Sequence, residues 1–256
     1  MPATLLLAPV VCLAAQVNTT QDLHLWYREP AQHWVAALPV GNGRLGAMVF
    51  GGTLEERIQL NEESVWAGEF GAYKNKAGTA RHIAEARRLF FEGKYAEGEA
   101  VMQREVMSER INPRSYQTLG DLRITLKGVS DNIADYRRDL DLDSSIATTR
   151  FTVDGITYTR EVFSSAADDV LVVRVTVSKP GALNLDIALD RPAGAETVAE
   201  GPDRLILTGR ASHNDERRGV TFEAQLQAVP DGGTIRTKED RLVLEDADAV
   251  TLLLTA

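Results

Sequence analysis

The second half of the chain alternates apolar and polar residues with a period of two. Leu183, Leu185 and Ile187 share one side of a run whose other side carries Asn184 and Asp186. This period is typical of a β-strand with one buried face. Eight such segments follow Gly120, separated by turn signals, at 121–127, 148–163, 170–178, 183–190, 204–210, 220–229, 241–246 and 250–256. They predict a mainly β fold, a large antiparallel sandwich rather than a parallel sheet.

Two dipeptide signals predict turns within this region. Asp154-Gly155 separates Val153 from Ile156, which is typical of a two-residue type I′ hairpin. Pro230 to Gly233 form a second predicted turn. These signals favour strands that reverse direction over strands joined by crossover helices.

A different period marks a short helical insert at about residues 78–107. Ala, Glu, Arg, Leu and Met dominate it, and these residues lose little entropy in a helix. Ile83, Ala86, Leu89 and Phe90 follow the helical spacing of three and four. Gly93 interrupts the pattern, so we expect a helical hairpin or a kinked helix.

The glycines between Pro39 and Gly52 match the pattern G-x-G-x-x-G at Gly41 to Gly46. A dinucleotide site requires a strand before this turn and a helix after it. Here "AMVFGG" follows, which is strand-like, and "RIQLNEESVW" then resembles the returning strand of a hairpin. We therefore expect a tight turn that presents Asn42 and Arg44, and no nucleotide site.

The N-terminal 15 residues form a separate predicted unit. "LLLAPVVCLAA" is too short to span a bilayer and resembles the apolar core of a signal peptide, although no Lys or Arg precedes it. The alternative is a buried N-terminal strand. We expect residues 1–15 to be a signal peptide, and the protein to be exported to a bacterial periplasm or the extracellular space. Cys12 is the sole cysteine, so the remaining chain holds no disulfide.

Net charge and residue spacing limit the candidate chemistry. A formal charge of -9 disfavours nucleic acid as a partner, but it leaves neutral sugars open. The four histidines lie far apart, and no serine has a G-x-S-x-G context, so we expect no metal, no cofactor and no serine hydrolase. The candidate carboxylates are Glu62, Glu63, Asp139, Asp141, Asp143, Asp168 and Asp169. Asp139, Asp141 and Asp143 alternate along one predicted strand, so we expect them to share a face, which admits a calcium or catalytic cluster, although a solvated face paired with Arg137 or Arg150 is favoured. Asp168 and Asp169 lie in a predicted turn, where acids are common.

Four ordered motifs carry a family resemblance: "LPVGNGRLGAMVFGG", "IQLNEESVWAG", "YQTLGDLRI" and "YRRDLDLDSSIATTRF". Together they resemble the N-terminal domain of glycoside hydrolase family 95, the inverting α-L-fucosidases, and the likeness spans residues 23–256. The resemblance implies a β-supersandwich, with an (α/α)6 catalytic barrel as its partner and a fucosylated glycan as the substrate of the parent enzyme. Members of the family also act on α-L-galactosides.

The family's catalytic residues lie in that barrel, and no position of this chain matches them. We therefore assign no catalytic residue, and we expect a fragment that is inactive in isolation, with no membrane span. Candidates for the substrate rim or the domain interface are Asn42, Arg44, Asn61, Glu62 and Trp66. Trp66 and Trp26 are candidates for stacking on a sugar ring, or for packing within the sandwich. The alternative functions are a free-standing carbohydrate-binding module and a purely structural sandwich.

Overall fold

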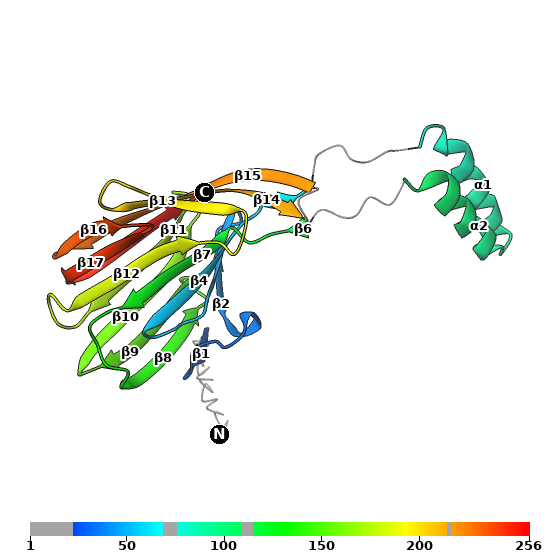
Figure 1. Cartoon of the computed structure of the whole chain (residues 1–256). Coiled ribbons are helices and arrows are strands. Elements are labelled where there is room, and N and C mark those ends of the chain that lie inside the picture. The colour runs from blue at the N-terminus through cyan, green and yellow to red at the C-terminus, as the bar shows by residue number, and fades with distance from the viewer. Residues whose placement is uncertain (1–22, 69–75, 109–114, 214–216) are drawn as a thin grey trace, which may run out of the picture.

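The computed structural model describes residues 23–68, 76–108, 115–213 and 217–256, and residues 1–15 lie outside these ranges. Two large antiparallel sheets pack face to face (Figure 1). The nine-stranded sheet has the order β1-β8-β9-β10-β11-β18-β15-β14-β13, and the seven-stranded sheet has the order β16-β17-β12-β7-β4-β3-β2. A two-stranded ladder joins β5 to β6. The predicted mainly β, antiparallel fold is confirmed.

The strands have the following bounds. In the nine-stranded sheet they are β1 His24–Tyr27, β8 Ile133–Asp141, β9 Ile146–Val153, β10 Ile156–Ser165, β11 Val170–Val177, β13 Ala195–Glu200, β14 Arg204–His213, β15 Arg217–Asp231 and β18 Ala249–Thr255. In the seven-stranded sheet they are β2 Leu38–Gly41, β3 Leu45–Val49, β4 Glu55–Glu62, β7 Gly120–Leu126, β12 Leu183–Asp190, β16 Thr234–Lys238 and β17 Arg241–Ala247. The small ladder pairs β5 Trp66–Ala67 with β6 Ser115–Tyr116.

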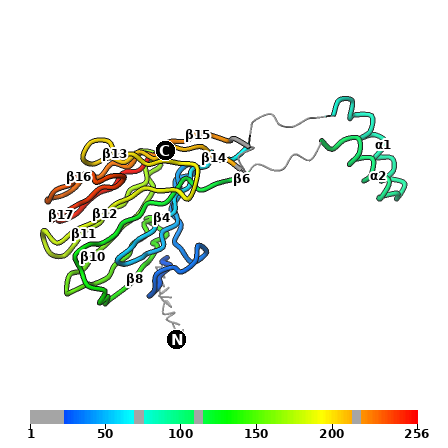
Figure 2. The backbone as a smooth tube through the Cα atoms, viewed as in Figure 1, coloured from blue at the N-terminus to red at the C-terminus, as the bar shows by residue number. Residues whose placement is uncertain are grey.

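The chain crosses between the two large sheets several times (Figure 2). Strands β11 and β12 are consecutive in sequence but belong to different sheets, and so do β17 and β18. Each crossing places residues that are distant in sequence on opposite walls of one core. The fold is therefore held by long-range contacts rather than by local hairpins alone.

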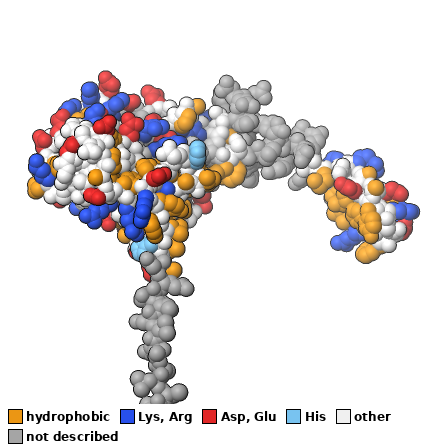
Figure 3. All heavy atoms as spheres, turned by 90° about the horizontal axis from the view of Figure 1, so that it is seen from below, with side chains coloured by type: hydrophobic (Ala, Val, Ile, Leu, Met, Phe, Trp, Pro, Cys, Tyr) orange, Lys and Arg blue, Asp and Glu red, His pale blue; other side chains and the backbone are white. Residues whose placement is uncertain are grey.

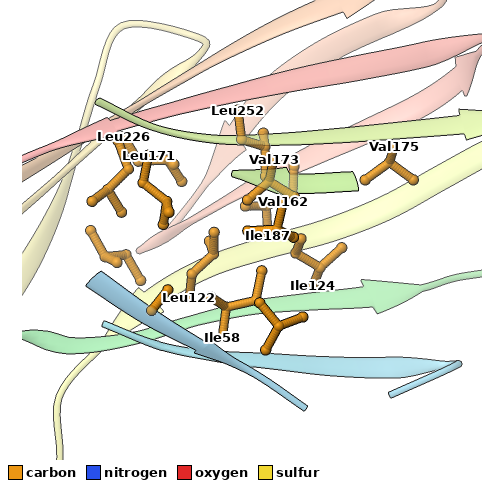
Figure 4. Close-up of a cluster of buried hydrophobic side chains, with 14 of the residues drawn as sticks. Ile58, Leu122, Ile124, Val162, Leu171, Val173, Val175, Ile187, Leu226 and Leu252 are labelled. Carbon is orange, nitrogen blue, oxygen red and sulfur yellow. The ribbon is translucent and has the colours of Figure 1, made fainter. Parts of the chain in front are cut away.

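The core lies between the sheets and follows directly from the alternation in the sequence. In β12 the residues from Leu183 to Leu189 alternate between buried and half-buried positions, as the period of two predicts. Ile58, Leu122 and Ile187 of the seven-stranded sheet lie across from Val162 and Leu252 of the other sheet (Figure 4). Burying each such side chain contributes about 1.5–3 kcal/mol.

Both predicted turns have the backbone conformation that their residues favour. Asp154 and Gly155 have φ values of 51° and 76°, and the flanking Val153 and Ile156 pair across the hairpin. Positive φ at both central residues is what a type I′ turn requires. The second turn contains two consecutive glycines with positive φ, Gly232 and Gly233.

The helical insert forms two helices, α1 from Thr79 to Phe91 and α2 from Tyr95 to Val101, and a π-helical turn over Met102–Val106 continues α2. Gly93 separates the helices with φ 76°, so the predicted interruption is confirmed. The helices share a small core of Ala86, Leu89 and Val101. Several hydrophobic side chains of this insert are exposed, namely Ile83, Phe90, Phe91, Tyr95 and Met107. Hydrophobic side chains are visible on the surface of the helices in Figure 3.

A buried ion pair joins the two sheets. Glu56 of β4 and Arg160 of β10 contact each other, and both side chains are buried. Glu56 also accepts a hydrogen bond from the Gly51 backbone N–H at 3.0 Å, and Arg160 donates to the Gly52 carbonyl at 3.0 Å. Burial raises the pKa of Glu56, while the positive charge of Arg160 opposes that rise.

One detail of the acidic set differs from the sequence prediction. Asp139 and Asp141 lie in β8, but Asp143 lies in the turn that follows, so the three do not share a strand face. Asp141 accepts hydrogen bonds from the backbone of Asp143 and from Ser144, which closes that turn. Asp139 pairs with Arg137 at 3.2 Å, as the solvated-face interpretation expects. The turn bends the chain before Asp143 can continue the alternation.

No helix in the described ranges is both long enough and apolar enough to cross a membrane.

Candidate functional site

The glycine-rich turn is a β-hairpin between β2 and β3. Asn42 closes it, because its side-chain Oδ1 accepts hydrogen bonds from the backbone N–H groups of Arg44 at 3.0 Å and Leu45 at 2.8 Å. Gly43 has φ 99°, a conformation that favours glycine. A strand, not a helix, follows the turn, so the expected hairpin is confirmed.

Arg44 connects this turn to the other sheet. Its guanidinium lies 2.7 Å from Asp169, in the turn before β11, and also contacts the carbonyl of Ala256 at the end of β18. The Nδ2 group of Asn42 donates to the carbonyl of Ser165 at 2.9 Å. Asn42 and Arg44 therefore hold the two sheets together at one end of the sandwich.

Glu62 lies at the end of β4, directly across from Leu45 in the register. Glu62 is only 8% exposed. Its Oε2 accepts hydrogen bonds from the backbone N–H and the hydroxyl of Ser64 at 2.8 and 2.7 Å. Its Oε1 lies 3.8 Å from the Arg44 guanidinium. Arg44 thus lies between two carboxylates, those of Asp169 and Glu62.

Trp66 forms an aromatic pair with Tyr116 next to this end. The ring centroids are 5.1 Å apart, and both side chains are partly exposed. The indole N–H of Trp66 donates to the carbonyl of Glu63 at 2.9 Å, and the Tyr116 hydroxyl donates to the carbonyl of Glu62 at 3.2 Å. Burial, together with the negative charges of Glu62 and Glu63, raises the pKa of Tyr116.

The structure therefore unites some of the candidates and separates others. Asn42, Arg44 and Glu62 come together, and Trp66 is joined to them through Tyr116. Asn61 precedes Glu62 in β4, so strand alternation directs it to the opposite face. Trp26 lies in β1 at the edge of the nine-stranded sheet, where Arg28 and Arg137 cover its ring.

Sequence reasoning named Asp169 only as a candidate carboxylate and did not predict its contact with Arg44, and it missed Ser165 and Tyr116 altogether. Asp169 stood in a predicted turn, where acids are common, so nothing in its neighbourhood indicated a distant arginine. The register of the small ladder, which pairs Trp66 with Tyr116, depends on residues far apart in the chain.

A hollow of about 480 Å³ opens beside this cluster. Its lining comes from four segments of the chain: Glu62, Ser64, Val65, Leu119, Val220, Thr221, Phe222, Glu223, Gln225, Thr255 and Ala256. A second hollow, of about 640 Å³, lies on β12, β16, β17 and the residues that follow β7, and it has a largely charged lining. Among the described residues, no group of three or more His, Cys, Asp or Glu side chains is placed to hold a metal ion.

Comparison with known proteins identifies the domain. Residues 25–256 match the family model described as "Glycosyl hydrolase family 65, N-terminal domain". The chain belongs to this family. It is also 32% identical to Alpha-L-fucosidase 2 of Arabidopsis thaliana over 93% of its own length and 30% of the relative's. It is 33% identical to "Probable alpha-fucosidase A" of Aspergillus niger over 59% of its own length and 20% of the relative's.

The chain thus spans less than a third of the length of these relatives. The expected resemblance to an N-terminal domain of α-L-fucosidases is confirmed, and the family model bears the name of family 65. This protein is a glycoside hydrolase-related N-terminal β-sandwich domain.

Proposed function

We propose that the chain is the N-terminal domain of an exported α-L-fucosidase that hydrolyses terminal α-L-fucosides with inversion. The observation that carries this proposal is the likeness to Alpha-L-fucosidase 2, which extends over 93% of the chain. The partner in this proposal is the (α/α)6 catalytic barrel of the same enzyme, and the substrate of the whole enzyme is a fucosylated glycan.

In this proposal, the end of the sandwich that carries Arg44 packs against the barrel and shapes the rim of its pocket. Arg44 and Asn42 join the turns of both sheets there. Trp66 and Tyr116 present partly exposed rings beside it, 39% and 45% exposed. Aromatic rings of this kind contribute strongly when a partner buries them.

The arrangement of carboxyl groups supports a catalytic centre outside this domain. Inverting hydrolysis uses two carboxyl groups about 6.5–9.5 Å apart, and the general acid needs a raised pKa. Burial raises the pKa of Glu56, but this carboxyl lies between the sheets, in contact with Arg160, and lines neither hollow. It therefore cannot reach a glycosidic bond.

A direct assay tests whether the catalytic groups lie outside this domain. The purified 256-residue chain is incubated with 4-nitrophenyl α-L-fucoside, and release of 4-nitrophenol is followed over several hours. We expect no release above the buffer blank. Turnover that persists through purification and is lost in a Glu62→Gln variant would place a catalytic group in this domain and overturn the proposal.

A further inference from the structure

A small cavity lies between the two large sheets, beside the buried pair of Glu56 and Arg160. Its walls come from both sheets and from the connection between β3 and β4: Thr53, Leu126, Phe151, Tyr158, Thr159, Arg160, Val175 and Leu185. The space in it that a water-sized molecule can occupy is about 10 Å³. One buried water needs about 10–15 Å³ of such space, so the cavity matches a single water in size.

Two polar atoms of this lining have no hydrogen-bond partner within the described part of the chain. Tyr158 and Arg160 alternate on the buried face of β10 and are 2% and 4% exposed. The phenol oxygen of Tyr158 and the guanidinium Nε of Arg160 are both buried, and neither is paired there. Burying a polar group without a partner is costly, so a second group that bonds to both atoms would be bound favourably.

The other contacts of these two side chains limit how far either can turn. The Tyr158 ring stacks on Phe151, with centroids 5.5 Å apart and planes inclined by 14°. The Arg160 Nη1 group pairs with Glu56 and donates to the Gly52 carbonyl at 3.0 Å. Each side chain would therefore lose an existing contact if it turned towards a different protein partner.

From this geometry we propose that the cavity binds one ordered water molecule, which accepts a hydrogen bond from Nε–H of Arg160 and donates one to the Tyr158 hydroxyl oxygen. The Thr53 hydroxyl belongs to the same lining and is a further hydrogen-bonding group for this water. Buried waters in proteins typically make about three hydrogen bonds. Because Thr53 follows a strand of the seven-stranded sheet and β10 belongs to the other sheet, the water bridges the two sheets.

Water fits this site better than an anion. Glu56 already supplies a negative charge to Arg160, so an added anion would be buried without a counter-charge of its own. The hydroxyl of Tyr158 can either donate or accept, which suits a neutral ligand with both capacities. The limited volume also excludes a sugar ring.

A crystal structure at a resolution that shows ordered waters tests the site directly. We expect an electron-density peak within about 3.2 Å of both the Tyr158 hydroxyl oxygen and Nε of Arg160. A cavity without density, or a direct contact between the two side chains, overturns the proposal. Crystals grown in bromide test the identity of the ligand, because anomalous scattering from the peak would assign the site to an anion instead.

Oxygen-17 magnetic relaxation dispersion counts long-lived bound waters in solution. Tyr158→Phe removes one hydrogen-bonding group from the cavity, so we expect one long-lived water fewer than in the wild type. Tyr136→Phe is the matched control, because the Tyr136 hydroxyl donates to the Gly51 carbonyl at 2.6 Å, and its count should not change. An unchanged count in Tyr158→Phe, or an equal loss in Tyr136→Phe, overturns the assignment. If Tyr158→Phe fails to fold, the crystal structure of the wild type decides alone.

Discussion

The guanidinium Nε of Arg44 lies 2.7 Å from Oδ2 of Asp169, and this contact joins turns that belong to different sheets. The same side chain contacts Glu62 and the carbonyl of Ala256. Because the three partners come from three segments, one side chain limits how far the sheets can separate at this end.

We expect Arg44→Ala to lower the free energy of unfolding by about 1–2 kcal/mol, since several charge-assisted contacts are lost but the pair with Asp169 is partly exposed. Urea denaturation measures the change. Arg241→Ala is the control, because Arg241 pairs with Asp240 at 3.5 Å on the surface, and this substitution should cost less than about 0.5 kcal/mol. Equal losses in the two variants would show that Arg44 does not join the sheets.

Removing one partner of the buried pair has a larger expected effect. Arg160→Met leaves the Glu56 carboxylate buried without its counter-charge, which costs about 3–5 kcal/mol of stability. The double variant Glu56→Leu with Arg160→Met removes both charges and should be clearly more stable than Arg160→Met alone. Urea denaturation compares them, and a double variant as unstable as the single one would contradict this reasoning.

The buried pair also has a pH signature. Because burial raises the pKa of Glu56 in the folded state, its contribution to stability is present below the unfolded pKa and is lost as pH rises through the folded pKa. Glu56→Gln resembles the protonated form at every pH. The free energy of unfolding of Glu56→Gln, measured relative to the wild type, should therefore be higher at about pH 7 than at about pH 4. Unfolding curves at the two pH values measure this, and a relative loss would mean that Arg160 lowers the pKa overall.

Gly219 has no room for a side chain. A Cβ at this position would lie 2.1 Å from the carbonyl oxygen of Trp66 and 2.6 Å from the Cα of Ala67. Gly219→Ala should lower stability by about 1–3 kcal/mol, because β5 must move away from β15. Thermal unfolding gives the shift. Gly46→Ala is the control, since its nearest contact is an ordinary 3.6 Å, and an equal loss there would argue against a local clash.

The N-terminal prediction concerns residues outside the described ranges. If residues 1–15 are a signal peptide, then a chain secreted by a bacterial host should begin at Ala15 or Gln16, after cleavage at the small residues. N-terminal sequencing of the mature protein measures this. A chain that keeps Met1 and stays inside the cell would instead favour the buried-strand alternative.

The buried strands could be predicted from sequence because each leaves a period of two. The alternation from Leu183 to Leu189 and the hairpin at Asp154 both appear as expected. Strands β1, β13 and β16 could not be predicted in this way. All three are edge strands, and edge strands bury less of either face, so their patterns are weak.

The candidate site was predictable only in part. Asn42 and Arg44 flank Gly43, whose positive φ forms the tight turn, so their position in a hairpin turn follows from the local sequence. Asp169 lies 125 residues away from Arg44, and a turn aspartate has the same local signature whether it faces solvent or an arginine. Contacts of this range depend on strand order, which single-sequence patterns do not encode.

The small ladder between β5 and β6 brings both ends of the helical segment to one point, with Trp66 opposite Tyr116 and Ala67 opposite Ser115. The polypeptide leaves the sandwich and returns to it through adjacent backbones. Lengthening or shortening the segment between β5 and β6 therefore leaves the strand register of the two large sheets unchanged. During divergence, that junction is a place where the gene could gain or lose a whole helical unit while the rest of the architecture stayed the same.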